Sequence, residues 1–220
     1  MSNIKIITSP NHPLIETLSD FIKTLITVDP ISVYELDAND FEDAETIIDL
    51  TCFDTDTKKS LIEKLELISD AQIISDLTVN WGESLIDQYT NLKGAIAACF
   101  WSPKATIECW SEDYETFKIA EDFFKSISIK LEKVNSPGIS FTYPRVISMI
   151  INEAYFSQGE ELASDDDIDT AMKFGVNYPV GPFEWARIIG RDKIVMVLDE
   201  LYRVTGDPRY RASQKLRFHA

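Results

Sequence analysis

The alternation of short apolar runs with amphipathic segments over residues 4–134 constrains the fold more than any other feature of this sequence. The run Ile4–Thr8 is mostly β-branched, and residues 14–25 have the apolar spacing of a helix. Further strands are predicted at 31–37, 46–50, 72–75, 94–98, 106–110 and 130–134, and further helices at 57–67 and 114–127. Strands that alternate with helices at this spacing form βαβ units, so we predict a mainly parallel, Rossmann-like α/β sheet.

The pattern changes after the sheet. Residues 135–138, with the sequence Asn-Ser-Pro-Gly, interrupt the alternation. Every later predicted element is helical, beginning with a long apolar helix over 144–158 whose apolar face suits a core or a subunit interface. We therefore predict an α/β domain over residues 1–138 followed by an all-α domain over 139–220.

The helical half carries regular start and stop signals. Ser164 followed three residues later by Asp167 resembles a capping box. Gly181-Pro182 suits a glycine N-cap followed by proline at the first helical position. Gly190 and Gly206 are placed as left-handed C-caps.

In their order and spacing, segments of this half resemble the C-terminal helical domain of the 3-hydroxyacyl-CoA dehydrogenases. The resemblance covers about the last third of the chain closely and the rest weakly. It implies an NAD-binding domain, a homodimer formed through the helical domain, and acyl-CoA or another small molecule as ligand. The family reaction is the NAD-dependent oxidation of a 3-hydroxyacyl-CoA to the 3-oxoacyl-CoA. The matching segments are Asn152-Glu153-Ala154, Asp167-Ile168-Asp169-Thr170-Ala171-Met172-Lys173, Tyr178-Pro179-Val180-Gly181-Pro182-Phe183-Glu184 and Gly206-Asp207-Pro208-Arg209-Tyr210-Arg211.

The first two thirds depart from the family where its chemistry takes place. A dinucleotide site needs glycines directly after the first strand, because they let the backbone approach the pyrophosphate. Here residues 9–14 read Ser-Pro-Asn-His-Pro-Leu. The family places its catalytic histidine after the fifth strand, where this chain has Cys99. This chain has two histidines, His12 and His219. Since neither is predicted at a strand end, no histidine–carboxylate pair is expected.

Five residues are the candidates that the resemblance leaves for a site. Glu108 aligns with the catalytic glutamate of the family if the intervening loop is about three residues shorter, and Cys99 takes the place of the base. Asp37 ends the predicted second strand, where an acid would bind the adenine ribose. Thr78 and Ser102 keep hydroxyl groups where the family contacts its substrate.

Composition excludes several other functions. The net charge of −16 argues against nucleic acid and anionic membranes as partners. No apolar run is long enough for a membrane span. The N-terminus lacks the features of a secretory signal, so we expect a cytoplasmic protein with reduced thiols. The three cysteines, Cys52, Cys99 and Cys109, show no metal-binding spacing, and no metal site is predicted.

Three functions remain open. The sequence favours a catalytically impaired relative of these dehydrogenases that binds a small ligand or partner in the cleft between sheet and helices. The second is an active 3-hydroxyacyl-CoA or 3-hydroxybutyryl-CoA dehydrogenase with a remodelled site that uses Glu108 and Cys99. The third is a structural or scaffolding homodimer.

Overall fold

The computed structural model describes residues 3–101, 106–218 and 220. The chain divides into two compact units, Met1–Phe141 and Thr142–Ala220. The division falls shortly after the predicted boundary at 138/139.

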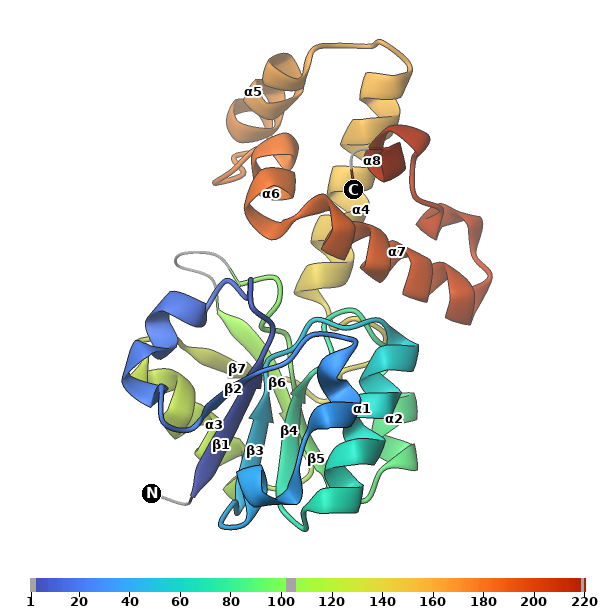
Figure 1. The fold of residues 1–220 in the computed structure, drawn as a ribbon. Coiled ribbons are helices and arrows are strands. Elements are labelled where there is room, and N and C mark those ends of the chain that lie inside the picture. Colours follow the sequence, from blue (N-terminus) through green and yellow to red (C-terminus); the bar gives the residue numbers. More distant parts are fainter. Residues whose placement is uncertain (1–2, 102–105, 219) are drawn as a thin grey trace. The chain divides into compact units, whose positions relative to one another are not determined.

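Seven strands of the first unit form one sheet in the order β2-β1-β3-β4-β5-β6-β7 (Figure 1). Neighbouring strands are parallel except β5 and β6, which are antiparallel. Because β1 lies between β2 and β3, the chain reverses its direction of winding there, and the crevice at the carboxyl ends of these strands is where such sheets bind ligands. The strands are β1 Ile4–Thr8, β2 Leu25–Thr27, β3 Thr46–Asp49, β4 Gln72–Asp76, β5 Leu92–Ile96, β6 Ile107–Ser111 and β7 Leu131–Lys133.

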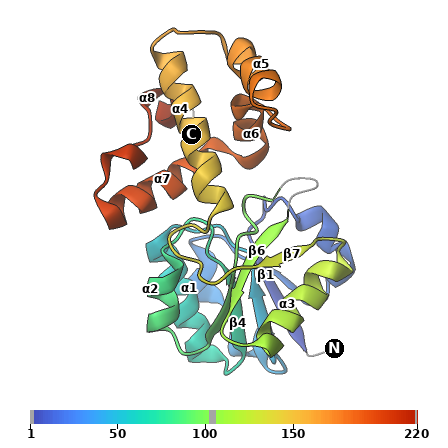
Figure 2. The same cartoon turned by 180° about the vertical axis from the view of Figure 1, so that it is seen from behind.

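Helices cover both faces of this sheet (Figures 1 and 2). On one face, α1 (Thr55–Ile68) and α2 (Gly82–Gln88) contribute Leu61, Ile62, Leu65 and Leu85 to a buried cluster. On the other, α3 (Tyr114–Ser126) and the 3-10 helix η1 (Ile15–Phe21) contribute Leu18, Ala120, Phe123 and Phe124. The apolar runs of the inner strands follow from this arrangement, since a strand covered on both sides buries every side chain.

Most predicted elements of this unit are confirmed, but the strand predicted at 31–37 is wrong. These residues form a 3-10 turn, η2 (Ser32–Glu35), and lead into a second, η3 (Ala38–Phe41). The carboxylate of Asp29 accepts hydrogen bonds from the backbone of Ile31 and Ser32, and such local bonds favour turns over strands. The true second strand, β2, lies at the end of the helix predicted over 14–25, which is shortened to η1. Helix α2 was not predicted.

The second unit is built around α4 (Tyr143–Gly159). Helices α6, α7 and α8 pack against α4, and α5 packs on α6. The Asn152 amide ties α4 to the C-terminal segment, because it donates to the Arg211 carbonyl at 3.0 Å and accepts from the Ser213 N–H at 2.8 Å. No helix among the described residues is both long and apolar enough to cross a membrane. The remaining elements are α5 Asp165–Gly175, α6 Pro182–Ile189, α7 Arg191–Thr205, η4 Pro208–Tyr210 and α8 Gln214–Phe218.

The junction between α5 and α6 explains the family-like segments around Asp169. This buried carboxylate accepts from the backbone N–H groups of Phe183, at 2.8 Å, and Glu184, at 3.2 Å, and so caps α6. Gly181, the N-cap residue, must lack a side chain there, because a Cβ atom would lie 2.3 Å from the Asp169 carboxyl carbon. The helix start predicted at Gly181-Pro182 is confirmed, with an added cap that the sequence did not reveal.

Of the other predicted caps, those at Ser164 and Gly206 are confirmed, and the left-handed cap predicted at Gly190 is wrong. The Ser164 hydroxyl accepts from the Asp167 N–H and donates to its carboxylate. Gly206 ends α7 in the left-handed conformation, with φ of 65°. Gly190 ends α6 with a positive φ of 99°, but its ψ of 127° takes it out of the left-handed helical region.

Replacing Gly206 by alanine tests the left-handed cap. We expect Gly206→Ala to lower the free energy of unfolding by about 1 kcal/mol, because a Cβ atom is strained at this φ although nothing lies within 4 Å of it. The matched control is Gly175→Ala at the end of α5, where a Cβ atom also has open space and φ is not positive. Urea unfolding followed by circular dichroism measures both, and equal effects would contradict the explanation.

Candidate functional site

Charged and polar side chains gather, fully buried, at the carboxyl ends of the central strands. This is the edge of the sheet where a Rossmann-like fold binds its ligand. Buried polar groups need partners, so each one at this edge either stabilises another or binds something else. The buried residues concerned are His12, Asp49, Thr51, Lys58, Ser75, Asp76, Thr78 and Asn80.

Asp49, the last residue of β3, is fully paired. Its Oδ2 lies 2.5 Å from the Nζ of Lys58, which projects from α1, and both side chains are completely buried. The Lys58 ammonium also donates to the carbonyl and hydroxyl of Thr51, each at 2.8 Å, and the Ser75 hydroxyl donates to Asp49 at 2.5 Å. A charge pair satisfied in this way fixes α1 against the end of β3.

Asp76, the last residue of β4, is the second buried carboxylate. Its Oδ1 accepts from both the backbone N–H, at 2.9 Å, and the hydroxyl of Thr78. Burial raises the pKa of the Asp76 carboxyl, while the positive charge of Lys58, the two bonds from Thr78 and a hydrogen bond from the Cys99 thiol oppose this rise. Asp76 Oδ2 has no hydrogen bond of ordinary geometry among the described residues.

His12 reaches Asp76 from the turn that follows β1. The sheet order places β3 between β1 and β4, so this turn crosses the end of β3. The imidazole is 3% exposed, and its Nε2 lies 4.0 Å from Asp76 Oδ2. The expectation that no histidine–carboxylate pair forms is therefore wrong. That expectation rested on the position of His12 beyond the end of a predicted strand. The turn after β1 folds so that the His12 side chain lies next to Asp76.

The turn after β1 does not fit a dinucleotide. A pyrophosphate needs backbone N–H groups that point towards it, as at the start of a helix. The N–H of His12 is bonded to the Ser9 carbonyl, that of Leu14 to His12 Nδ1, and that of Ile15 to the His12 carbonyl. Pro10 and Pro13 have no N–H. Leu14 is completely buried where the family has its last glycine, and the helix that follows is the short η1.

The structure brings together only part of the predicted site. Cys99 is 1% exposed, and its Sγ, a ring nitrogen of His12 and an oxygen of Asp76 lie within 4.8 Å of one another. Among the described residues Glu108 is outside this group. It is half-buried on β6, opposite Glu132 of β7. Thr78 is buried, and its hydroxyl donates a hydrogen bond to Asp76. The predicted contact of this hydroxyl with substrate remains a prediction.

Two further candidates have different outcomes. Asp37 is exposed and caps η3 together with Asp40, so it does not end a strand and its predicted role at the ribose loses its basis. Ser102 lies outside the described residues. The acid that does follow the second strand is Asp29, exposed and two residues beyond β2. Hydrogen bonds to its own turn, mainly from the Ser32 N–H, lower the pKa of its carboxyl.

Sequence reasoning missed His12, Asp29, Asp49, Lys58 and Asp76. For Asp29 the signal was present, because an acid follows the apolar run Leu-Ile-Thr-Val, but Leu25 was predicted to end a helix and the other three residues were given no strand. Lys58 was predicted only as part of the first turn of the helix over 57–67. Nothing in the spacing of the sequence indicates that its ammonium lies under the sheet edge.

Comparison with known proteins identifies the fold family. A family model for the 3-hydroxyacyl-CoA dehydrogenase C-terminal domain matches residues 141–218. The sequence is 30% identical, over 183 residues, to 3-hydroxybutyryl-CoA dehydrogenase of Clostridioides difficile, an alignment that covers 79% of this chain and 64% of that protein. The helical unit belongs to the 3-hydroxyacyl-CoA dehydrogenase family.

Two further comparisons differ in how much of this chain they cover. The 3-hydroxyadipyl-CoA dehydrogenase of Escherichia coli (strain K12) is 45% identical over 76 residues, which cover 34% of this chain and 16% of that protein. The chain thus spans less than two thirds of either curated relative. The crystal structure of (S)-3-hydroxybutyryl-CoA dehydrogenase from Ralstonia eutropha shares the fold, with a TM-score of 0.72 and 20% identity, over 99% of this chain and 93% of that chain.

Replacing Lys58 tests whether the buried pair holds the sheet edge. We expect Lys58→Met to lower the free energy of unfolding by about 3–5 kcal/mol, because it leaves the buried Asp49 without a counter-charge. The adjacent and partly exposed Lys59 provides the control, and Lys59→Met is expected to change stability by less than about 0.5 kcal/mol. Both are measured by urea unfolding, and a similar loss in the two variants would argue against the role of the pair.

Proposed function

We propose that this chain is a 3-hydroxyacyl-CoA dehydrogenase-like protein that has lost the NAD-dependent oxidation of its family. The turn after β1 carries this proposal. The N–H groups of His12, Leu14 and Ile15 are bonded within the turn, two of its residues are prolines, and His12 and Leu14 are buried at the sheet edge. A pyrophosphate bound there would need the turn to refold.

The position of the catalytic base supports the same proposal. Oxidation of a 3-hydroxyl needs a base that takes the hydroxyl proton, and a histidine oriented by a carboxylate suits this task. Cys99 occupies that position, and it is 1% exposed, with its thiol within 4.8 Å of the Asp76 carboxyl. A thiol buried beside a carboxyl is not arranged to accept a proton from a substrate.

The assay that tests this proposal is NADH-dependent reduction of acetoacetyl-CoA at high protein concentration, with Glu108→Gln purified in parallel. We expect no turnover above background in either protein, because the cofactor turn is closed and Glu108 is outside the buried cluster. Binding of NADH, followed by its fluorescence, is expected to be absent as well. The C. difficile relative serves as the positive control for the assay.

Turnover that Glu108→Gln abolishes would overturn the proposal and favour the active dehydrogenase with a remodelled site. Equal weak turnover in both proteins would be due to host enzymes that copurify, since the variant removes the one predicted carboxylate. With no turnover, the wild-type chain is screened against acyl-CoA and other small molecules, which separates a ligand-binding protein from a structural one.

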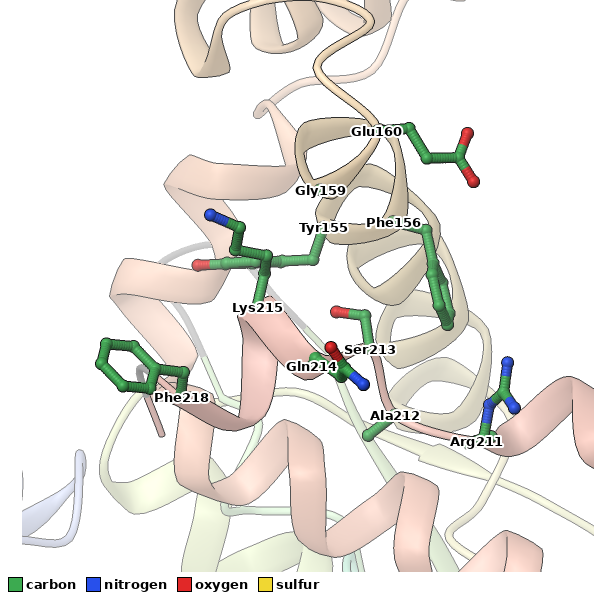
Figure 3. Close-up of a pocket in the computed structure, with 10 residues that line it drawn as sticks. All are labelled: Tyr155, Phe156, Gly159, Glu160, Arg211, Ala212, Ser213, Gln214, Lys215 and Phe218. Carbon is green, nitrogen blue, oxygen red and sulfur yellow. The ribbon is translucent and has the colours of Figure 1, made fainter.

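We also propose that two copies pair through the helical unit. A groove of about 840 Å³ runs between the C-terminal half of α4 and α8 (Figure 3). Phe156 and Phe218 line it, and Phe218 is 83% exposed. Glu160 and Lys215 also line the groove, so a two-fold axis through it can match the acid of one copy with the base of the other.

A charged residue in the groove tests this interface. We expect the wild-type chain to have the mass of a dimer by light scattering, and Phe218→Asp to have that of a monomer, because a buried unpaired carboxylate opposes association. Phe174→Asp on α5 is the control, since Phe174 is also 83% exposed but lies outside the groove. A monomeric wild type, or a dimer that Phe174→Asp disrupts and Phe218→Asp does not, would contradict this interface.

A further inference from the structure

Three side chains from distant parts of the sequence converge at the carboxyl edge of the sheet. His12 comes from the turn after β1, Asp76 from the end of β4, and Cys99 from the segment after β5. Their ligand atoms, a ring nitrogen, a carboxylate oxygen and the thiol sulfur, lie within 4.8 Å of one another. None of the three residues is more than 3% exposed.

The carboxylate of Asp76 is oriented towards this meeting point. Thr78 holds Oδ1 with both its backbone N–H and its hydroxyl, while Oδ2 faces His12 and accepts no hydrogen bond of ordinary geometry among the described residues. A buried carboxylate oxygen in this state carries a desolvation cost that a cation would remove. A hydroxyl that fixes the other oxygen is the kind of outer contact that orients metal ligands.

We propose that His12, Asp76 and Cys99 bind a divalent transition-metal ion of the zinc type. Three atoms no more than 4.8 Å apart share a point that is at most about 2.8 Å from each, and zinc binds such atoms at about 2.0–2.3 Å, so each ligand needs to move by less than about 1 Å. The donor set of imidazole, carboxylate and thiolate suits zinc and disfavours magnesium and calcium, which prefer oxygen ligands alone.

Metal binding changes two protonation states in this cluster. The Leu14 N–H donates to His12 Nδ1 at 3.2 Å, which leaves the imidazole proton on Nε2. When the ion binds Nε2, the proton on Nε2 moves to Nδ1. The hydrogen bond from the Leu14 N–H to Nδ1 is then lost. Cys99 loses its thiol proton to solvent, because the thiolate is the metal ligand. Binding is therefore expected to weaken as pH falls.

The test uses the full-length chain without a histidine tag, stripped of metal with a chelator and titrated with Co²⁺ as a spectroscopic substitute for zinc. We expect equimolar binding with a thiolate-to-cobalt charge-transfer band, displaced by Zn²⁺ and not by Mg²⁺. Cys99→Ser is expected to abolish the band, and Thr78→Val, which keeps all three ligands, to weaken binding by about 10–100-fold.

The matched control is Cys109→Ser. Cys109 is an equally buried thiol on β6, outside the cluster, and burial raises its pKa to about 12. This variant is expected to keep the band. If Cys99→Ser does not fold, X-ray absorption of the wild-type zinc protein decides, with one sulfur expected at about 2.3 Å. Absence of Co²⁺ binding by the wild type, a band that survives Cys99→Ser, or a zinc site without sulfur would overturn the proposal.

Discussion

Two carboxylates buried at the ends of neighbouring strands determine how this sheet edge is built. A buried carboxylate without partners costs several kcal/mol, so Asp49 and Asp76 require compensation. For Asp49 it comes from Lys58, which fixes the position of α1. For Asp76 it comes from Thr78, Cys99 and the nearby His12. The turn after β1 therefore folds over the end of β3, in the place where a dinucleotide-binding member of the family leaves its backbone open.

The sequence predicted the fold better than the site because the two depend on different kinds of information. Strands such as β3 and β4 are buried on both faces and read as apolar runs, and the helix starts at Ser164 and Gly181 follow from local chemistry. The prediction of a strand at 31–37 was wrong because Asp29 and Asp37 each accept a hydrogen bond from the backbone N–H two residues further on. These local bonds outweigh the β propensity of the segment. The approach of His12 to Asp76 depends on how the turn after β1 crosses the end of β3. The spacing of apolar residues along the sequence does not indicate the path of this turn.

Alignment with the family found the right positions but gave them the wrong partners. Cys99 was singled out as the residue in place of the base, and one of the predicted functions used it together with Glu108. The structure instead groups Cys99 with Asp76 and His12. The two differences from the family, in the turn after β1 and after β5, look independent along the sequence. In the fold His12 and Cys99 meet beside Asp76, so the two differences are better understood as one rebuilt site than as separate losses.

The two units have diverged to different degrees because their family-like residues do different work. In the helical unit Asp169 caps α6, Gly181 gives that carboxylate room, and Asn152 joins α4 to the C-terminal segment. These contacts stabilise the unit whether or not a reaction takes place. The glycine turn and the histidine of the family serve the cofactor and the substrate, and the sheet does not need them in order to fold. In a chain that does not catalyse the family reaction, the glycine turn and the histidine can therefore be replaced freely. The contacts of the helical unit cannot, because the stability of that unit depends on them.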